Sequence, residues 1–201
     1  MDLCAKVVDA VKAEIKMPGL KVAYQPVTSA NRIPLLQNGT IDIECGSTTN
    51  SVERQKQVAF GPTYFVINVS AAVKKSSGIK SFADLKGKKA AQSLTSNYGK
   101  LATENGAELV ATDGFDQSIQ LVITGRADAT LNDSLSFLDF KKQKPDAPVK
   151  IAAEDANGQP SGIIVRQGDD DLVAAINTAL DAIKADGTYQ KISDKYFGQD
   201  V

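Results

Sequence analysis

Apolar residues recur at spacings of three and four over residues 3–15, which predicts an amphipathic helix that Pro18-Gly19 ends. After this helix, strand-like and helix-like segments alternate to the end of the chain. Strands are predicted at 20–24, 40–45, 63–73, 89–93, 107–111, 127–131 and 162–165. Helices are predicted at 31–38, 97–105, 115–124, 134–142, 172–183 and 189–197, with a charged turn or helix at 52–57. The alternation predicts an α/β fold with mainly parallel strands.

A short internal repeat aligns residues 33–42 with residues 119–128, at a constant offset of 86 positions. In each copy a predicted helix ends at a glycine, Gly39 or Gly125, and a strand that carries an aspartate follows. Glycine tolerates the left-handed conformation that closes many helices. Chance is one explanation for so short a match. The other is a pair of similar α/β lobes, each about half of the chain. Their strands would end at a shared cleft, because ligands of open α/β sheets bind at that edge.

Composition excludes several classes of function. The chain has 201 residues and a formal net charge of −1, which argues against a nucleic-acid partner. No apolar run approaches the roughly 18 residues of a membrane span. Histidine is absent, which removes the usual general base, and the two cysteines are too few for a cysteine-rich zinc site. We expect no metal and no cofactor. We also expect no signal peptide, because no basic segment with an apolar core begins the sequence.

Two clusters of hydroxyl residues and arginine lie in the first third. Ser47 and Thr49 follow the strand 40–45, and Arg54 comes shortly after them. A guanidinium can hold a carboxylate through two hydrogen bonds, and nearby hydroxyls can add others. The alternative is a polar loop with a solvated arginine. Ser29 and Arg32 form a second cluster of the same kind, and two such clusters in one predicted lobe indicate affinity for an acidic group.

The second half offers donors and an acid at two further strand ends. Thr95 and Ser96 precede the helix 97–105, whose N-terminal amides can bind an anion. Ser96 can equally be a helix N-cap. Asp133 follows the strand 127–131, where it can pair with a ligand ammonium or cap the next helix. Arginines with hydroxyls on one lobe, and donors with an aspartate on the other, would recognise both charges of an α-amino acid.

Ordered motifs along the chain resemble a known family. They include Gly46-Ser47-Thr48-Thr49, Ser81-Phe82-Ala83-Asp84-Leu85 and segments at 53–60, 125–129, 161–166, 185–189 and 195–198. This order resembles the family-3 extracellular solute-binding proteins, the polar amino-acid receptors of bacterial ABC importers. The resemblance implies a two-lobed periplasmic-binding-protein fold of type II, each lobe a mainly parallel sheet flanked by helices. Lobe 1 would comprise residues 1–67 and 161–201, and lobe 2 residues 68–160.

The resemblance also implies a ligand site. The stretches 31–39 and 44–50 resemble the glutamate/aspartate-binding subgroup most. By that resemblance Arg54 would hold the α-carboxylate of the ligand, and Ser47 and Thr49 would assist it. Ser29 and Arg32 would contact the side-chain carboxylate.

In lobe 2, the resemblance implies that Thr95 and Ser96 donate to the α-carboxylate and that Asp133 binds the ammonium. The segment 93–98 departs from the subgroup and resembles cystine or neutral amino-acid receptors. Glutamate or aspartate is therefore the favoured ligand, with cystine or another polar or neutral amino acid as the alternative. The family's first strand and an aromatic loop, which precede the helix at Leu3, have no counterpart here, so we expect lobe 1 to be incomplete at its N-terminus.

Cys4 and Cys45 either form a disulfide, as they could in an exported protein, or remain two buried thiols.

We expect a soluble, monomeric binding component that closes two lobes on an L-amino acid and delivers it to a membrane permease. The resemblance places it in the periplasm or outside the cell. An enzyme is the main alternative, because a few relatives dehydrate cyclic acids with a cleft carboxylate as general acid. Asp133 would have to play that part, with a raised pKa and no cationic neighbour. A third alternative is the ligand-binding module of a receptor or channel.

Overall fold

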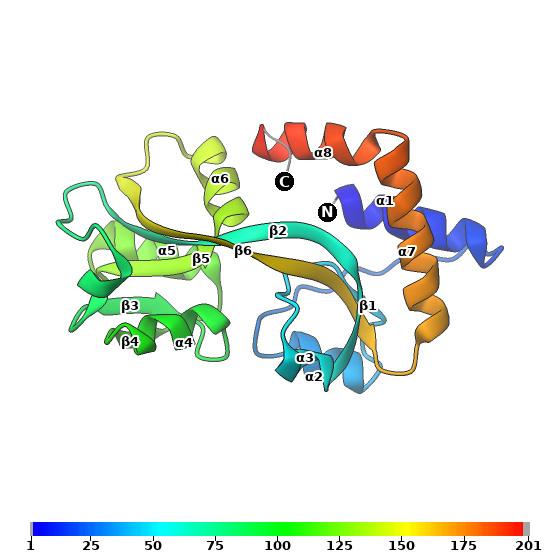
Figure 1. The fold of residues 1–201 in the computed structure, drawn as a ribbon, viewed down its shortest axis with the longest axis horizontal. Coiled ribbons are helices and arrows are strands. Elements are labelled where there is room, and N and C mark those ends of the chain that lie inside the picture. Colours follow the sequence, from blue (N-terminus) through cyan, green and yellow to red (C-terminus); the bar gives the residue numbers. More distant parts are fainter. Residues whose placement is uncertain (1, 199–201) are drawn as a thin grey trace. The chain divides into compact units, whose positions relative to one another are not determined.

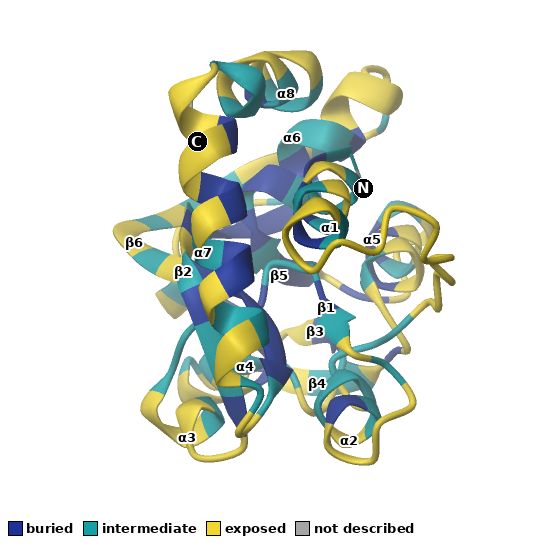
Figure 2. Cartoon of the chain, turned by 90° about the vertical axis from the view of Figure 1, so that its right-hand side faces the viewer, coloured by how far each residue is buried: buried dark blue, intermediate teal, exposed yellow. Residues whose placement is uncertain are grey.

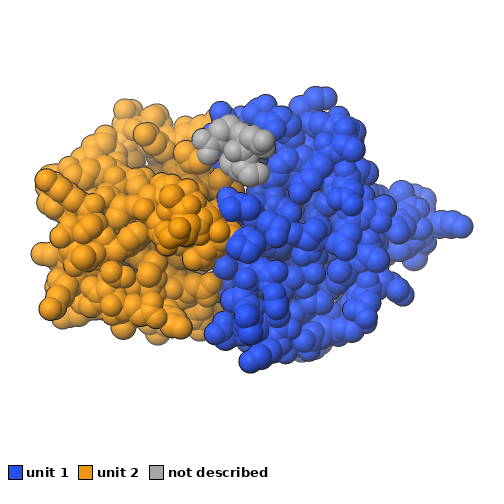
Figure 3. Space-filling model, viewed as in Figure 1, with its two compact units in different colours: residues 1–26, 32–66, 160–201 blue, residues 27–31, 67–159 orange. Residues whose placement is uncertain are grey.

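Two compact units make up the computed structural model, which describes residues 2–198 (Figure 3). Unit 1 takes the residues up to Pro26, Arg32–Val66 and the residues from Pro160 onward. Unit 2 takes Val27–Asn31 and Ile67–Gln159. Two long strands, β2 (Val58–Lys74) and β6 (Val149–Arg166), each contribute residues to both units (Figure 1).

Unit 1 combines helices from both ends of the chain. Its short strand β1 (Ile43–Glu44) pairs antiparallel with β6, Ile43 opposite Val165, and β6 is followed by β2 in the sheet. Its helices are α1 (Asp2–Glu14), α2 (Arg32–Gln37), α3 (Val52–Gln55), α7 (Asp170–Ala185) and α8 (Thr188–Phe197).

The core of unit 1 follows from the apolar stripes of two helices. Leu3, Val7 and Val11 of α1 are buried, and α1 lies alongside α7, whose Ile176 and Leu180 are also buried. Figure 2 shows the buried face of α7 and the exposed face opposite it. Spacings of three and four put such residues on one side of a helix, and their burial is the main stabilising term.

Unit 2 is an α/β sheet with parallel strands at one edge. β3 (Lys89–Gln92) pairs in parallel with β4 (Glu108–Ala111) and with β5 (Ala129–Asp133), and β5 pairs antiparallel with β2. Three α-helices and one 3₁₀ helix complete this unit: η1 (Phe82–Leu85), α4 (Asn97–Glu104), α5 (Phe115–Thr124) and α6 (Ser134–Gln143).

The core of unit 2 has several apolar clusters. One contains Val73, Leu85 and Leu131, and another joins Ile119 of α5 to Phe137 of α6. These clusters bury the inward residues of β2 and β5, so the sheet of this unit is held by packing as well as by its hydrogen bonds.

Most predicted elements are confirmed, but the strand predicted at 20–24 is wrong. Leu20, Val22 and Tyr24 alternate as strand residues do, yet they are 44%, 39% and 56% exposed and belong to no strand. A strand is stable only beside a neighbouring strand, and local alternation does not provide one. The strand predicted at 162–165 is part of the much longer β6, whose residues 149–160 are exposed or half-buried. β1 pairs antiparallel with β6, and β2 pairs antiparallel with β5, so the sheet is mixed and not mainly parallel.

The cysteine alternative is settled in favour of a bond. Cys4 at the start of α1 and Cys45 directly after β1 form a disulfide, with their Cα atoms 5.8 Å apart. The bond ties α1 to the strand end that precedes the predicted ligand loop. None of the helices within residues 2–198 is both long enough and apolar enough to cross a membrane.

Candidate functional site

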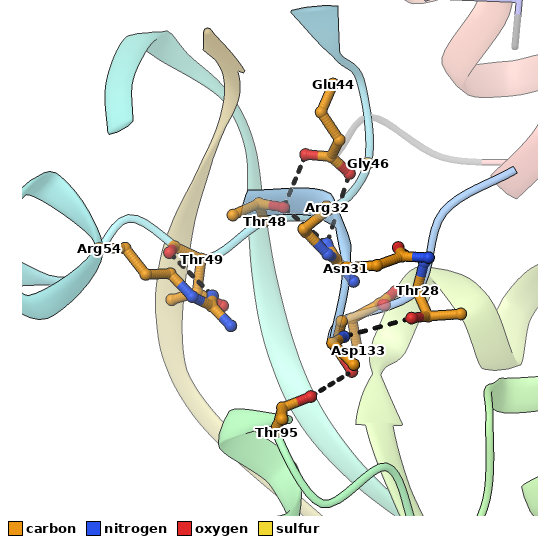
Figure 4. Close-up of polar contacts among 12 residues, drawn as sticks. Thr28, Asn31, Arg32, Glu44, Gly46, Thr48, Thr49, Arg54, Thr95 and Asp133 are labelled. Atoms are coloured by element: carbon orange, nitrogen blue, oxygen red, sulfur yellow. Dashed lines mark hydrogen bonds and ion pairs between the residues drawn. The ribbon is translucent and has the colours of Figure 1, made fainter. Parts of the chain in front are cut away.

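Arg54 is held beside the hydroxyl loop of unit 1. Ser51 caps the short helix α3 by accepting a hydrogen bond from the Arg54 amide, which places Arg54 in the first turns after the loop. The Arg54 guanidinium donates to the carbonyl oxygen of Thr49 at 3.0 Å (Figure 4). Thr49 itself is 7% exposed and forms an isolated antiparallel bridge with Ser161 of β6. Arg54 and Thr49, predicted to act on the same carboxylate, are therefore in contact.

Arg32 belongs to a buried polar network that the sequence did not reveal. Arg32 Nη1 lies 3.4 Å from Oε1 of Glu44 and donates to Oγ1 of Thr48 at 2.6 Å. Thr48 in turn donates to Oε2 of Glu44 at 2.8 Å, which closes the network (Figure 4). Glu44 is 5% exposed and Thr48 is fully buried. The guanidinium is thus oriented by two acceptors and has a carboxylate as its immediate counter-charge.

The loop between β1 and α3 has little freedom next to this network. A side chain at Gly46 would place its Cβ 2.2 Å from Oε1 of Glu44, so glycine leaves the room that the carboxylate occupies. The Tyr64 hydroxyl donates to the Gly46 carbonyl. Ser47, half-buried, lies between this fixed glycine and buried Thr48. The predicted donors of unit 1 are consequently held on a preformed loop.

Ser29 lies in unit 2, within the segment Val27–Asn31. Its hydroxyl is 2.6 Å from the hydroxyl of Ser93 and accepts from Thr95 Oγ1 at 3.3 Å, while Ser93 and Thr95 are 3.4 Å apart. The three hydroxyls therefore form one cluster, although Ser29 is 64 positions from Ser93 and 66 positions from Thr95 in the sequence. Hydroxyls can both donate and accept, so the cluster can turn its donors toward an anion.

Ser96 and Asp133 both act as helix caps. Ser96 accepts from the Tyr98 amide at 3.1 Å and begins α4. Asp133 is 3% exposed at the end of β5, and it accepts from the Ser136 amide at 2.7 Å and from the Ser136 hydroxyl at 2.9 Å. The capping alternative is confirmed for both residues. A carboxylate offers about four acceptor positions, so capping and ligand binding are compatible for Asp133.

The structure thus brings the predicted residues together in part. Within unit 1 it joins Arg54 to Thr49, and within unit 2 it joins Ser29 to Thr95. Sequence reasoning did not single out Glu44 and Thr48, which are the partners of Arg32, or Ser93, which is the partner of Ser29. For Glu44 a signal existed, since a charged residue within a predicted strand and close to arginines calls for a partner.

The chain has two compact α/β units that share the long strands β2 and β6. Hydroxyls, arginines and a carboxylate lie at their loop and strand ends. An ancestral arginine-binding protein bound to arginine matches with a TM-score of 0.85 and 38% identity, covering 97% of this chain and 87% of that one. The predicted fold class, the type II fold of periplasmic amino-acid-binding proteins, is confirmed.

The sequence profile of the bacterial extracellular solute-binding proteins, family 3, matches residues 5–199, and the chain belongs to this family. A probable amino-acid ABC transporter-binding protein of Haemophilus influenzae is 37% identical over 96% of this chain and 76% of its own length. The L-glutamate/L-aspartate-binding protein of Pseudomonas aeruginosa is 37% identical over 100% of this chain and 68% of its own. The L-cystine-binding protein TcyA of Bacillus subtilis is 36% identical over 96% and 72%.

These relatives are solute-binding proteins, and the chain is an amino-acid solute-binding protein of an ABC transporter. Their names differ in the amino acid bound, so the family alone does not select the ligand.

Proposed function

We propose that the chain binds an acidic L-amino acid, glutamate or aspartate, and delivers it to the membrane permease of its transporter. The observation that carries this proposal is the pair of arginines in unit 1, each held in place by hydrogen bonds beside buried threonines. An acidic amino acid has two carboxylates, and two fixed guanidinium groups match them. Similarity to the P. aeruginosa glutamate/aspartate-binding protein supports the same ligand.

The proposed roles follow the residue chemistry. Arg54, with Ser47 and Thr49, binds the α-carboxylate, and Thr95 and Ser96 add donors from unit 2. Because Thr49 is buried and Arg54 already donates to its carbonyl, the guanidinium needs little ordering when a ligand arrives.

The remaining residues bind the other two charged groups of the ligand, its side-chain carboxylate and its ammonium. Arg32 and Ser29 contact the side-chain carboxylate, and Asp133 accepts the ammonium. A ligand that lacks one of these charges forms one charge-assisted hydrogen bond fewer in the site, which lowers its affinity. We propose that the two units close on the ligand by hinge motion at the crossings of β2 and β6.

Calorimetric titration with the common L-amino acids and cystine tests the proposal. We expect the tightest binding for glutamate or aspartate, and a loss of about thirtyfold or more in Arg54→Ala, because a desolvated ligand carboxylate then lacks its partner. Arg54→Lys keeps the charge without the bidentate geometry and should fall between the two. Equal binding by wild type and Arg54→Ala would refute the role of Arg54.

Cystine is the second candidate ligand. The Ser93 hydroxyl that completes the Ser29 cluster belongs to the segment that resembles cystine and neutral amino-acid receptors, and the B. subtilis relative binds L-cystine by name. Selective binding of cystine in the same titration would transfer the assignment to this ligand.

The cellular setting is proposed along with the ligand. We propose a monomer in the periplasm or outside the cell, as expected for this family. Light scattering of the purified chain and fractionation of the producing cells test these two statements. The dehydratase alternative predicts turnover of a cyclic acid that disappears in Asp133→Asn, whereas the binding role predicts no turnover.

A further inference from the structure

The Arg32–Glu44 pair has a consequence for ligand choice. Arg32 is the proposed partner of the ligand's side-chain carboxylate, yet Glu44 Oε1 lies 3.4 Å from its Nη1 atom and is almost completely buried. A ligand carboxylate that approaches Arg32 therefore meets the attraction of the guanidinium and, a few ångströms farther on, the repulsion of Glu44. Buried charges interact strongly at such distances, because little water screens them.

We propose that Glu44 is a specificity-determining residue that sets how strongly the Arg32 end of the site prefers an anionic ligand side chain. This inference rests on the proposed function. Glu44 contributes through Arg32 and has no need to touch the ligand. Its negative charge subtracts from the positive charge of Arg32, so it keeps the preference for a second carboxylate moderate.

Several features show that the arrangement is built rather than incidental. Glu44 uses both oxygens, one toward Arg32 and one toward Thr48, so its side chain has a single orientation. Thr48 receives a hydrogen bond from Arg32 and gives one to Glu44, which locks the distance between the two charges. Gly46 lacks the Cβ that would collide with the Glu44 carboxylate.

Glutamate and glutamine are the matched ligand probes for this inference, since they share a shape and differ by one negative charge. Glu44→Gln is the matched protein variant, because it keeps the shape and can still accept from Thr48. We expect the ratio of glutamate affinity to glutamine affinity to rise about tenfold in Glu44→Gln, since the repulsion from a charge within several ångströms is removed.

Two control variants separate charge from architecture. Thr48→Val removes the hydrogen bonds but keeps the Glu44 charge, so both affinities should change together and their ratio should stay within about twofold. Glu44→Asp keeps the charge on a shorter side chain and should preserve the wild-type ratio of the two affinities. This variant tests the role of the charge even when Glu44→Gln folds poorly. A purely structural Glu44 would lower both affinities alike in every variant.

The outcomes keep the two proposals apart. Glutamate binding by wild type with an unchanged ratio in Glu44→Gln would refute the role of Glu44 and leave the proposed function standing. If wild type binds another amino acid and no glutamate, the proposed ligand is wrong. In that case the role of Glu44 stands only if Glu44→Gln gains glutamate binding over glutamine, and it is otherwise overturned.

Discussion

The helix end at Gly39 in unit 1 and the helix end at Gly125 in unit 2 are built from the same hydrogen bonds, shifted by 86 positions. The glycine amide donates to Leu36 in unit 1 and to Val122 in unit 2, each at 3.1 Å. The next amide donates at 2.9 Å to Leu35 and to Leu121, respectively. Both glycines are left-handed, with φ of 77° and 76°. The repeat in the sequence is therefore also a repeat in structure.

The strands that follow the two helix ends differ. β5 has five residues and lies between β2 and β3, whereas β1 has two residues and stands at the edge of the sheet, paired with β6. Both aspartates of the repeat are exposed, and Asp128 accepts a hydrogen bond from the Lys89 amide of β3 at 2.8 Å. Similar local sequences thus build the same turn, while the length of a strand depends on the neighbours it finds.

The two copies also anchor their strands by different means. Cys45 and Leu131 occupy equivalent positions, 86 residues apart, and Cys45 is bonded to Cys4 of α1 whereas Leu131 is 1% exposed in an apolar cluster. Two positions farther on, the same offset of 86 relates Ser47 to Asp133, both proposed ligand residues. A covalent bond in unit 1 and apolar packing in unit 2 therefore support corresponding positions of the repeat.

Removal of the disulfide should have the largest effect. The bond joins residues 41 positions apart. The chain-entropy relation for such a loop gives about 4 kcal/mol of lost stability in the double variant Cys4→Ser/Cys45→Ser. Equilibrium urea unfolding measures the loss. Reductant should lower the stability of wild type and leave the double variant unchanged, and equal midpoints for oxidised wild type and the variant would contradict the prediction.

Loss of the equivalent apolar anchor comes next. Leu131→Ala removes a buried side chain from unit 2 and should cost about 3 kcal/mol, from lost burial and the cavity left behind. Leu94→Ala in the same unit is the matched control, because Leu94 is 65% exposed and its change should stay below about 0.5 kcal/mol. Urea unfolding compares them, and similar midpoints for the two variants would count against packing as the anchor.

The two helix ends should respond alike to alanine. Gly39→Ala and Gly125→Ala each force a side chain into the left-handed region, at a cost of about 1–2 kcal/mol. The added Cβ would lie 3.3 Å from Arg166 Nη1 in the first variant and 2.6 Å from Lys74 Nζ in the second, and that lysine end can move away. Gly78→Ala, with nothing within 4 Å, is the control. Thermal unfolding measures both variants. A lower melting temperature in only one of Gly39→Ala and Gly125→Ala would contradict the structural equivalence of the two helix ends.

The aspartates should show the smallest effect. Asp128→Ala removes the acceptor of the Lys89 amide and should cost about 1 kcal/mol. Asp42→Ala at the equivalent exposed position should change stability by less than about 0.5 kcal/mol. Amide exchange by NMR adds a local measurement, because Lys89 should lose protection in Asp128→Ala. An equal loss of stability in both variants would mean that the hydrogen bond from the Lys89 amide of β3 to Asp128 contributes nothing measurable.

Helices whose signals are local were predictable from the sequence. The structure places α5 at the predicted residues 115–124, and α7 extends the predicted 172–183 by two residues at each end. Their apolar spacing and the glycine after α5 act within a few residues, whatever surrounds them. The sequence predicts strands at both 20–24 and 107–111, but only the second segment has a neighbouring strand, as β4 beside β3.

The candidate site divides in the same way. The amino-acid sequence by itself determined which residue types lie at strand and helix ends, and it left Ser96 and Asp133 as caps or ligands, of which the structure shows the caps. Capping joins residues two or three positions apart, so a local pattern contains it. Only the tertiary structure decided that Glu44 and Thr48 surround Arg32 and that Ser93 meets Ser29, because packing of distant segments brings these side chains together.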